Sequence, residues 1–153
     1  MCNPALPTTC GVVFPPPLPG HGTPISHMAI ELDHTIVCAR DAGTDARQLA
    51  ELLGVPWGKA AAGPSTAVYV NAGLTLDFID SDGEIAVQHL CFRVSRQEFD
   101  AILARLRAAG IAYRSTVRGP ADYKMDPHYG NVYWNEPEGR QWEMLLVSYA
   151  RQP

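Results

Sequence analysis

The chain has 153 residues, which suffices for one ordinary domain or for two small modules that share a core. Its formal net charge of -4 gives no basic stripe for a phosphate backbone, and no apolar run approaches the roughly 18 residues that span a bilayer. Four cysteines without a CxxC spacing are typical of reduced thiols. We therefore expect a cytoplasmic protein that binds neither nucleic acid nor membrane.

Residues 1–27 differ in composition from the rest of the chain. They hold seven prolines and neither lysine nor arginine, and their apolar residues follow no period. This composition predicts a disordered, proline-rich extension that is polyproline-like around residues 15–17. An alternative is a docking tail for a partner that reads proline.

A first module is expected over residues 28–82. Residues 29–38 predict a strand, and residues 41–53 carry apolar side chains at i, i+3, i+4 and i+7, a helical pattern that Gly54 closes. Short strands follow, at residues 55–59, 66–71 and 74–80. The order is βαβββ.

A second module repeats this order over residues 83–149, before a short tail at 150–153. Residues 86–94 predict a strand. Ser95 and Glu98 form a capping box for a helix that ends at Gly110. Strands are expected at residues 112–117, 131–135 and 141–147. Two tandem βαβββ modules define an α+β fold, which we expect to form a curved mixed sheet.

The two modules align residue by residue. The segments from the histidine to the glycine that ends the helix differ in length by a single residue, VYVN matches VYWN, and GLTLD matches GRQWE. The repeat pairs His34 with His89 and Asp77 with Glu143.

Strand alternation predicts that these four side chains share one face. Residues at i and i+2 of a strand point the same way. Leu90, Phe92 and Val94 form an apolar face toward the helix, which turns His89, Cys91 and Arg93 to the opposite side. By the same reasoning, the side chains of His34, Asp77 and Glu143 also point away from the helices.

Two imidazoles and one or two carboxylates in a concavity suit a borderline divalent ion: Fe2+, Mn2+, Ni2+, Co2+ or Zn2+. The alternative is that each histidine is an ordinary hydrogen-bonded strand residue. Asp77 is a methylene shorter than glutamate, which leaves open whether it reaches the ion.

The words DHTIV, QHLCFRV and NEPEGRQWEMLL, within this duplicated arrangement, resemble the vicinal oxygen chelate (VOC) superfamily. That superfamily includes glyoxalase I, methylmalonyl-CoA epimerase, extradiol dioxygenases, and fosfomycin and bleomycin resistance proteins. The resemblance covers residues 28–149 and implies a single VOC domain, the glyoxalase fold, whose sheet encloses a metal-binding cup. It implies metal ligands at His34, His89 and Glu143. Asp77 stands where lyases and epimerases of the family often carry a fourth ligand and where extradiol dioxygenases usually have none.

The implied activity is that of a metal-dependent enzyme whose ion chelates vicinal oxygens of a small substrate and acts as a Lewis acid. Glu143 or Asp77 is expected to move a proton in lyase or isomerase chemistry, whereas Fe(II) would permit ring-cleaving dioxygenation. The alternative is a metal-free small-molecule binding protein of the bleomycin resistance kind. Retention of the three ligands favours the enzyme.

The substrate pocket is expected to include Cys91 and Arg93, which share the face of His89, and residues of the loop 118–129: Tyr123, Lys124, His128 and Tyr129. A homodimer is expected from the resemblance and because symmetric pairs are the commonest oligomers. The sequence leaves open whether the site is formed by one chain or by two.

Overall fold

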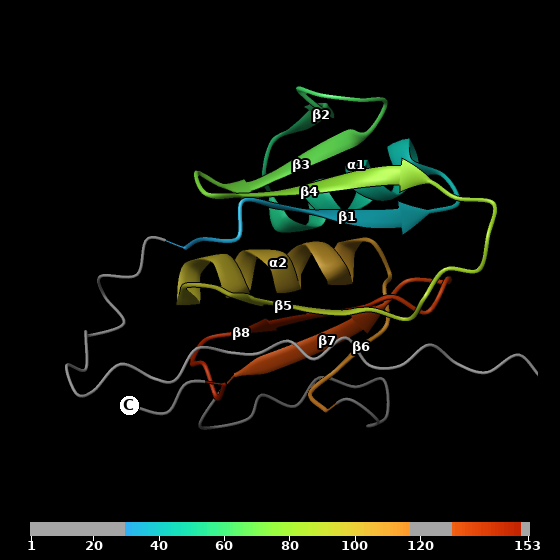
Figure 1. Ribbon diagram of the computed structural model, residues 1–153. Coiled ribbons are helices and arrows are strands. Elements are labelled where there is room, and N and C mark those ends of the chain that lie inside the picture. The colour runs from blue at the N-terminus through green and yellow to red at the C-terminus, as the bar shows by residue number, and fades with distance from the viewer. Residues whose placement is uncertain (1–29, 117–129, 151–153) are drawn as a thin grey trace, which may run out of the picture. The chain divides into compact units, whose positions relative to one another are not determined.

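The computed structural model describes residues 30–116 and 130–150 (Figure 1). The chain divides into a unit of residues 1–30 and a unit of residues 31–153, and the fold described below is that of the second unit. The extension expected at residues 1–27 lies outside the described residues.

The first module forms a four-stranded mixed sheet with one helix. Its elements are β1 (His34–Ala39), α1 (Ala42–Leu53), β2 (Trp57–Lys59), β3 (Thr66–Asn71) and β4 (Leu74–Asp80). The strand order is β1-β4-β3-β2, with β1 parallel to β4 and the other pairs antiparallel. The helix begins where the Asp41 carboxylate accepts a 2.8 Å hydrogen bond from the Thr44 N–H. It ends at Gly54, whose φ of 76° lies in the left-handed region.

The second module repeats this arrangement. Its elements are β5 (His89–Arg93), α2 (Arg96–Ala108), β6 (Tyr113–Arg114), β7 (Asn131–Asn135) and β8 (Gln141–Leu145). The strand order is β5-β8-β7-β6, the same order as in the first sheet, again with the outer parallel pair β5 and β8. The predicted capping box of Ser95 and Glu98 is present at the start of α2. The α+β fold of two βαβββ modules is confirmed.

β1 and β5 begin at least three residues later than their apolar runs predict. β1 begins at His34 rather than at residue 29, and β5 begins at His89 rather than at residue 86. In each case the parallel partner begins at the same level, because β4 starts at Leu74 and β8 starts at Gln141. A strand cannot extend beyond the neighbour that satisfies its backbone groups.

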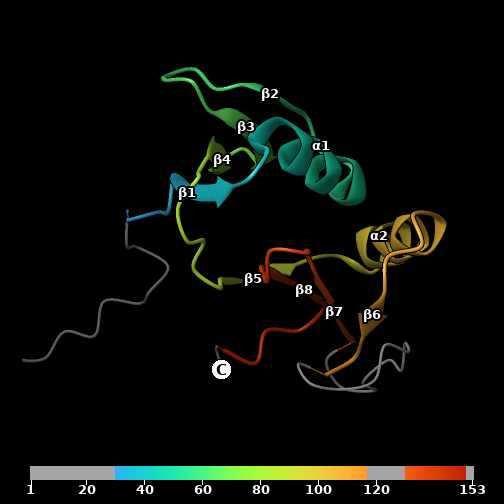
Figure 2. The same cartoon turned by 90° about the vertical axis from the view of Figure 1, so that its right-hand side faces the viewer.

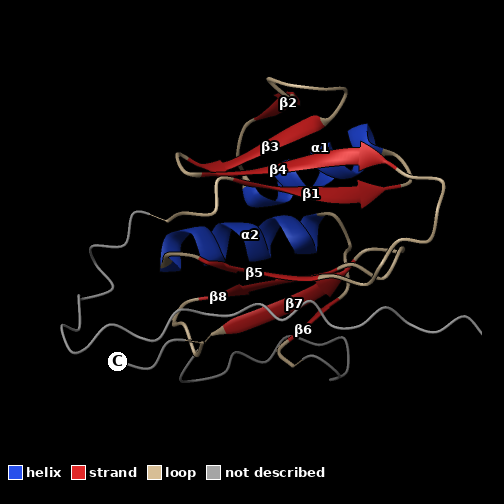
Figure 3. Ribbon diagram, in the orientation of Figure 1, coloured by secondary structure: helices blue, strands red, loops and turns tan. Residues whose placement is uncertain are grey.

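Both helices lie on the same side of the strands, next to each other (Figures 2 and 3). Their buried side chains and the inner faces of both sheets form one hydrophobic core, which includes Leu49, Phe78, Phe99, Leu106, Trp134 and Trp142. The opposite faces of the sheets are therefore left for polar residues. Within the described ranges, no helix has the length and apolar character needed to cross a membrane.

Candidate functional site

The sheet register brings each histidine close to the acid of its own module. His34 lies opposite Thr75 in the β1–β4 pair, and Asp77 is two residues further along. His89 lies opposite Gln141 in the β5–β8 pair, and Glu143 is again two residues further along. Because a step of two residues returns to the same face of a strand, each acid shares the face of its histidine. The repeat found in the sequence is thus a repeat in space.

In the second module the histidine and the acid are in direct contact. Nε2 of His89 lies 3.0 Å from Oε2 of Glu143, and Nδ1 of His89 lies 2.7 Å from Oε1 of Gln141. The Glu143 side chain is fully buried, whereas that of His89 is 42% exposed. One ring nitrogen is therefore fixed by a neutral neighbour while the other faces a carboxylate, the arrangement that orients histidine ligands in metal sites.

Three protonated groups surround the Glu143 carboxylate. The Tyr149 hydroxyl donates to its two oxygens at 2.9 and 3.2 Å. Burial, and then the hydrogen bond to Glu143, raise the pKa of Tyr133 well above its ordinary value. Burial and the charge of Glu143 raise the pKa of the Cys91 thiol to about 12. These groups stay protonated at neutral pH and donate hydrogen bonds to the Glu143 carboxyl group.

Sequence reasoning missed Gln141, Tyr133 and Tyr149. Gln141 precedes Glu143 by two residues and so shares its face, and Tyr133 lies opposite Glu143 in the β7–β8 pair. Strand alternation and the hairpin register therefore hold a signal for these two. Tyr149 follows the end of β8, where no periodic pattern places a side chain.

The first module presents a more open pair. Nδ1 of His34 lies 2.8 Å from Oδ2 of Asp33, and both side chains are largely exposed. That hydrogen bond raises the pKa of His34, and the charge of Asp77 acts in the same direction. Oδ1 of Asp77 is buried and has no hydrogen-bond partner among the described residues. A buried carboxylate oxygen without a partner is costly, which makes Asp77 the unsatisfied group of this half.

The two halves stay apart within the described chain. No three of His34, Asp77, His89 and Glu143 have ligand atoms within 4.8 Å of one another. A cavity of about 690 Å³ lies on the second half only, lined there by His89, Cys91 and Arg93 of β5 and by residues 145–150. Cys91 and Arg93 thus line the same cavity as His89. Tyr123, Lys124, His128 and Tyr129 lie outside the described residues.

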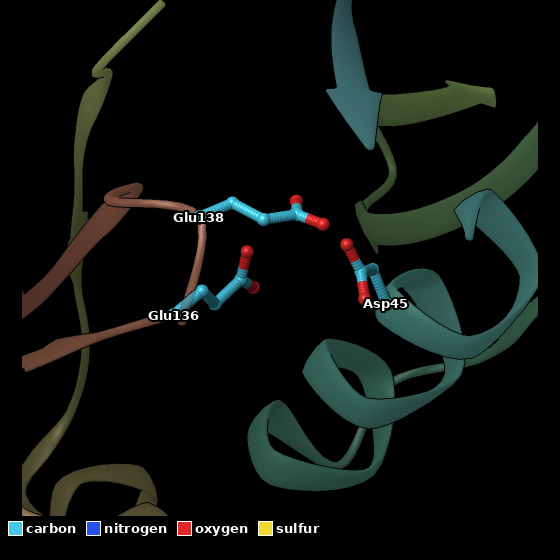
Figure 4. Close-up of side chains that lie close together, drawn as sticks. All are labelled: Asp45, Glu136 and Glu138. Atoms are coloured by element: carbon cyan, nitrogen blue, oxygen red, sulfur yellow. The ribbon is translucent and has the colours of Figure 1, made fainter. Parts of the chain in front are cut away.

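A separate group of three acids lies between the modules. Figure 4 shows Asp45 of α1 turned toward Glu136 and Glu138 of the turn between β7 and β8. Their carboxylate oxygens lie within 4.8 Å of one another, close enough for a metal ion. These acids already have a cation of their own, because the fully buried Arg140 reaches all three of them.

Arg140 joins the modules through several groups at once. Its Nη2 lies 3.0 Å from Oδ2 of Asp45 and 3.6 Å from Oε2 of Glu138, and it also pairs with Glu136. Nη1 donates to the backbone carbonyl of Cys38 in β1. The guanidinium stacks over the rings of two core residues, Phe78 and Trp142. This cluster is therefore a buried ion network that ties β1 and α1 to the second module.

The network predicts a pH dependence of stability. Burial raises the pKa of Glu136 above its ordinary 4.5, so the folded chain binds this proton more tightly than the unfolded chain does. The contribution of Glu136 to stability is therefore complete below pH 4.5 and falls as the pH rises through the raised pKa. Glu136→Gln removes this titration. We expect its free energy of unfolding, relative to wild type, to increase from pH 4.5 to pH 7 in urea denaturation.

The matched control for this prediction is Glu51→Gln, which changes an exposed carboxyl on α1. Its difference from wild type should not follow the same trend. If the free energy of unfolding of Glu136→Gln relative to wild type stays constant over this pH range, burial does not raise the pKa of Glu136 in the folded chain.

No family model and no curated protein sequence matches the chain. Solved structures do match it. The oxidase ChaP-H2 is 36% identical over 80% of this chain and 97% of its own, with a TM-score of 0.73. The oxidase ChaP-H1 is 35% identical over 80% of this chain and 100% of its own, with a TM-score of 0.72. The fosfomycin resistance protein FosX from Listeria monocytogenes is 15% identical over 82% of this chain and 97% of its own, with a TM-score of 0.59. This similarity is one of fold alone.

The duplicated βαβββ fold, with a histidine and an acid repeated at equivalent positions, defines a two-module α+β protein of the fold that FosX also has. The identity to the two oxidases extends over nearly their whole length. The chain belongs to the vicinal oxygen chelate superfamily, as its motifs predict.

Proposed function

We propose that the chain is a metal-dependent enzyme that oxidises a small molecule bearing two adjacent oxygens. The observation that carries this proposal is the pair of His89 and Glu143, a buried carboxylate 3.0 Å from an imidazole nitrogen that lines a 690 Å³ cavity. The motifs leave lyase, isomerase and dioxygenase chemistry open. The similarity to two proteins named as oxidases favours oxidation.

The donor set fits a divalent ion. Two ligand atoms bound side by side to one ion, each about 2.1 Å from it, are about 3 Å apart, and Nε2 of His89 and Oε2 of Glu143 have this separation. The partnerless Oδ1 of Asp77 is a further oxygen that an ion would satisfy. We propose His34, His89 and Glu143 as ligands and Asp77 as a fourth.

When bound, a divalent ion supplies Lewis acidity toward the two substrate oxygens and, as Fe(II), an open position for dioxygen. The chain's own residues orient the reactants and move protons. Tyr149 donates to Glu143 and holds that carboxylate in one orientation. Where Oδ1 of Asp77 is not bound to the ion, Asp77 takes the proton of a substrate hydroxyl, because this oxygen has no competing hydrogen bond among the described residues. Leu146 and Val147 add apolar surface to the lining of the cavity.

We further propose that a second copy of the chain completes the site. His34 and Asp77 lie on one sheet and His89 and Glu143 on the other, so each sheet carries half of the ligand set. Ile36 lies on the His34 face and is 45% exposed, an apolar side chain that a partner would cover. A symmetric pair with the first module of one copy against the second module of the other would form two equal sites.

Metal content tests this function. We expect purified chain, reconstituted with Fe(II) under nitrogen, to bind about one ion per subunit. His89→Ala removes a ligand, and even lost partners of ligands weaken metal binding by 10- to 100-fold, so we expect an affinity at least about 100-fold lower. Arg47→Gln, which changes an exposed residue of α1 outside the cavity, should keep its metal. With a catechol under air, the wild type should consume oxygen.

Each failure of this test has a distinct meaning. Wild type without stoichiometric metal, or His89→Ala with equal metal, would favour the metal-free binding protein. Stoichiometric metal without oxygen uptake across a panel of catechols would contradict oxidation and favour lyase or isomerase chemistry.

A further inference from the structure

The cavity beside His89 is mostly apolar and has one permanent cation among its described lining residues. Arg93 lines it from β5, together with His89, Cys91 and residues 145–150. Arg93 makes no ion pair or hydrogen bond with any described residue. The acid that contacts His89, Glu143, is buried and already paired with His89 and Tyr149. Within the described ranges, no side chain thus competes with a bound molecule for the guanidinium.

The distance between Arg93 and His89 on β5 sets the expected length of the bound molecule. Arg93 and His89 are four residues apart on one strand and share a face. Their Cα atoms are therefore about 13 Å apart. Arg93 and His89 line the same cavity, and the apolar residues Leu146 and Val147 also line it.

We infer that Arg93 binds an anionic group of the substrate, a carboxylate or a comparable oxyanion. This inference rests on the proposed function and narrows it. The substrate carries its two adjacent oxygens at one end, an apolar body, and the anion roughly 10 Å away, a separation set by the strand spacing and shortened by the reach of the arginine side chain. Arginine suits this role because its planar guanidinium can give two parallel hydrogen bonds to a carboxylate.

A matched pair of probes tests the inference. The first is 4-(3,4-dihydroxyphenyl)butanoic acid, and the second is its methyl ester, which differs in the charge. Both are titrated by calorimetry into full-length chain loaded with Zn2+ under nitrogen, so that no turnover occurs. We expect wild type to bind the acid about tenfold more tightly than the ester, the effect of one charge-assisted contact near solvent. In 0.5 M salt this preference should decrease.

The variants separate this contact from general charge effects. Arg93→Gln should bind both probes equally, and Arg93→Lys should keep part of the preference for the acid. Arg47→Gln removes an exposed arginine of α1 outside the cavity and should keep the tenfold ratio. Equal binding of acid and ester by wild type, or an unchanged ratio in Arg93→Gln, would overturn the inference.

The proposed function fails by a different result. If His89→Ala binds both probes as tightly as wild type, the metal-binding role of His89 is wrong. A tenfold ratio that persists in His89→Ala and disappears in Arg93→Gln would still support the contact between Arg93 and the anion.

Discussion

Replacing Arg140 with glutamine is expected to lower the free energy of unfolding by about 3–5 kcal/mol at pH 7.5. The arginine is fully buried and pairs with Asp45, Glu136 and Glu138, so its loss leaves three neighbouring carboxylates without a cation. It also leaves the Cys38 carbonyl without its donor. Urea denaturation followed by tryptophan fluorescence measures the loss.

A matched arginine outside the network gives the scale for this experiment. Arg96 pairs with Asp100 at 3.7 Å on the exposed face of α2. Arg96→Gln should therefore change stability by less than about 0.5 kcal/mol. The deficit of Arg140→Gln should also shrink at lower pH, because burial raises the pKa values of Asp45 and Glu136 and these carboxyls become neutral. If Arg140→Gln lowers the free energy of unfolding by less than about 1 kcal/mol at pH 7.5, the prediction is wrong. Hydration or protonation would then stabilise the three carboxyls without Arg140.

The sequence predicts most of the fold because local signals and the repeat agree. The helix α2 begins at a capping box formed by Ser95 and Glu98, which are only three positions apart in the sequence. β3 and β4 have the predicted bounds, since the turn between them is marked by small and polar residues. The starts of β1 and β5 differ because a strand ends where its neighbour ends, a property of the sheet that neither apolar run contains.

The candidate site was predictable only in part. Alternation and repetition put His34, Asp77, His89 and Glu143 on the predicted face, because face is a local property of a strand. Contacts between modules have no local signal. Arg140 sits in a turn-like segment, and its partner Asp45 is 95 residues earlier, so nothing in either segment indicates burial or pairing.

The half-sites on the two sheets give the sharpest test of how the proposed centre is assembled. We expect the His34→Ala and His89→Ala variants each to lose metal, because either change removes a ligand from every site. If each site is formed by residues of two copies, a mixture of the two variants regains some of the bound metal. Random exchange makes half of the dimers mixed, and each mixed dimer has one intact site of two, so about one quarter of wild-type metal returns.

Two variants of the same half provide the control. His89→Ala and Glu143→Ala change ligands on the same sheet, so in a mixed dimer each site lacks one of them and no metal returns. Subunit exchange is followed by mass spectrometry of differently labelled chains, and bound metal is measured on the separated dimers. Recovery in the first mixture alone would mean that His34 of one copy and His89 of the other hold one ion. Full exchange without recovery would mean that a single chain brings them together, which requires the two sheets to be rearranged when the ion binds.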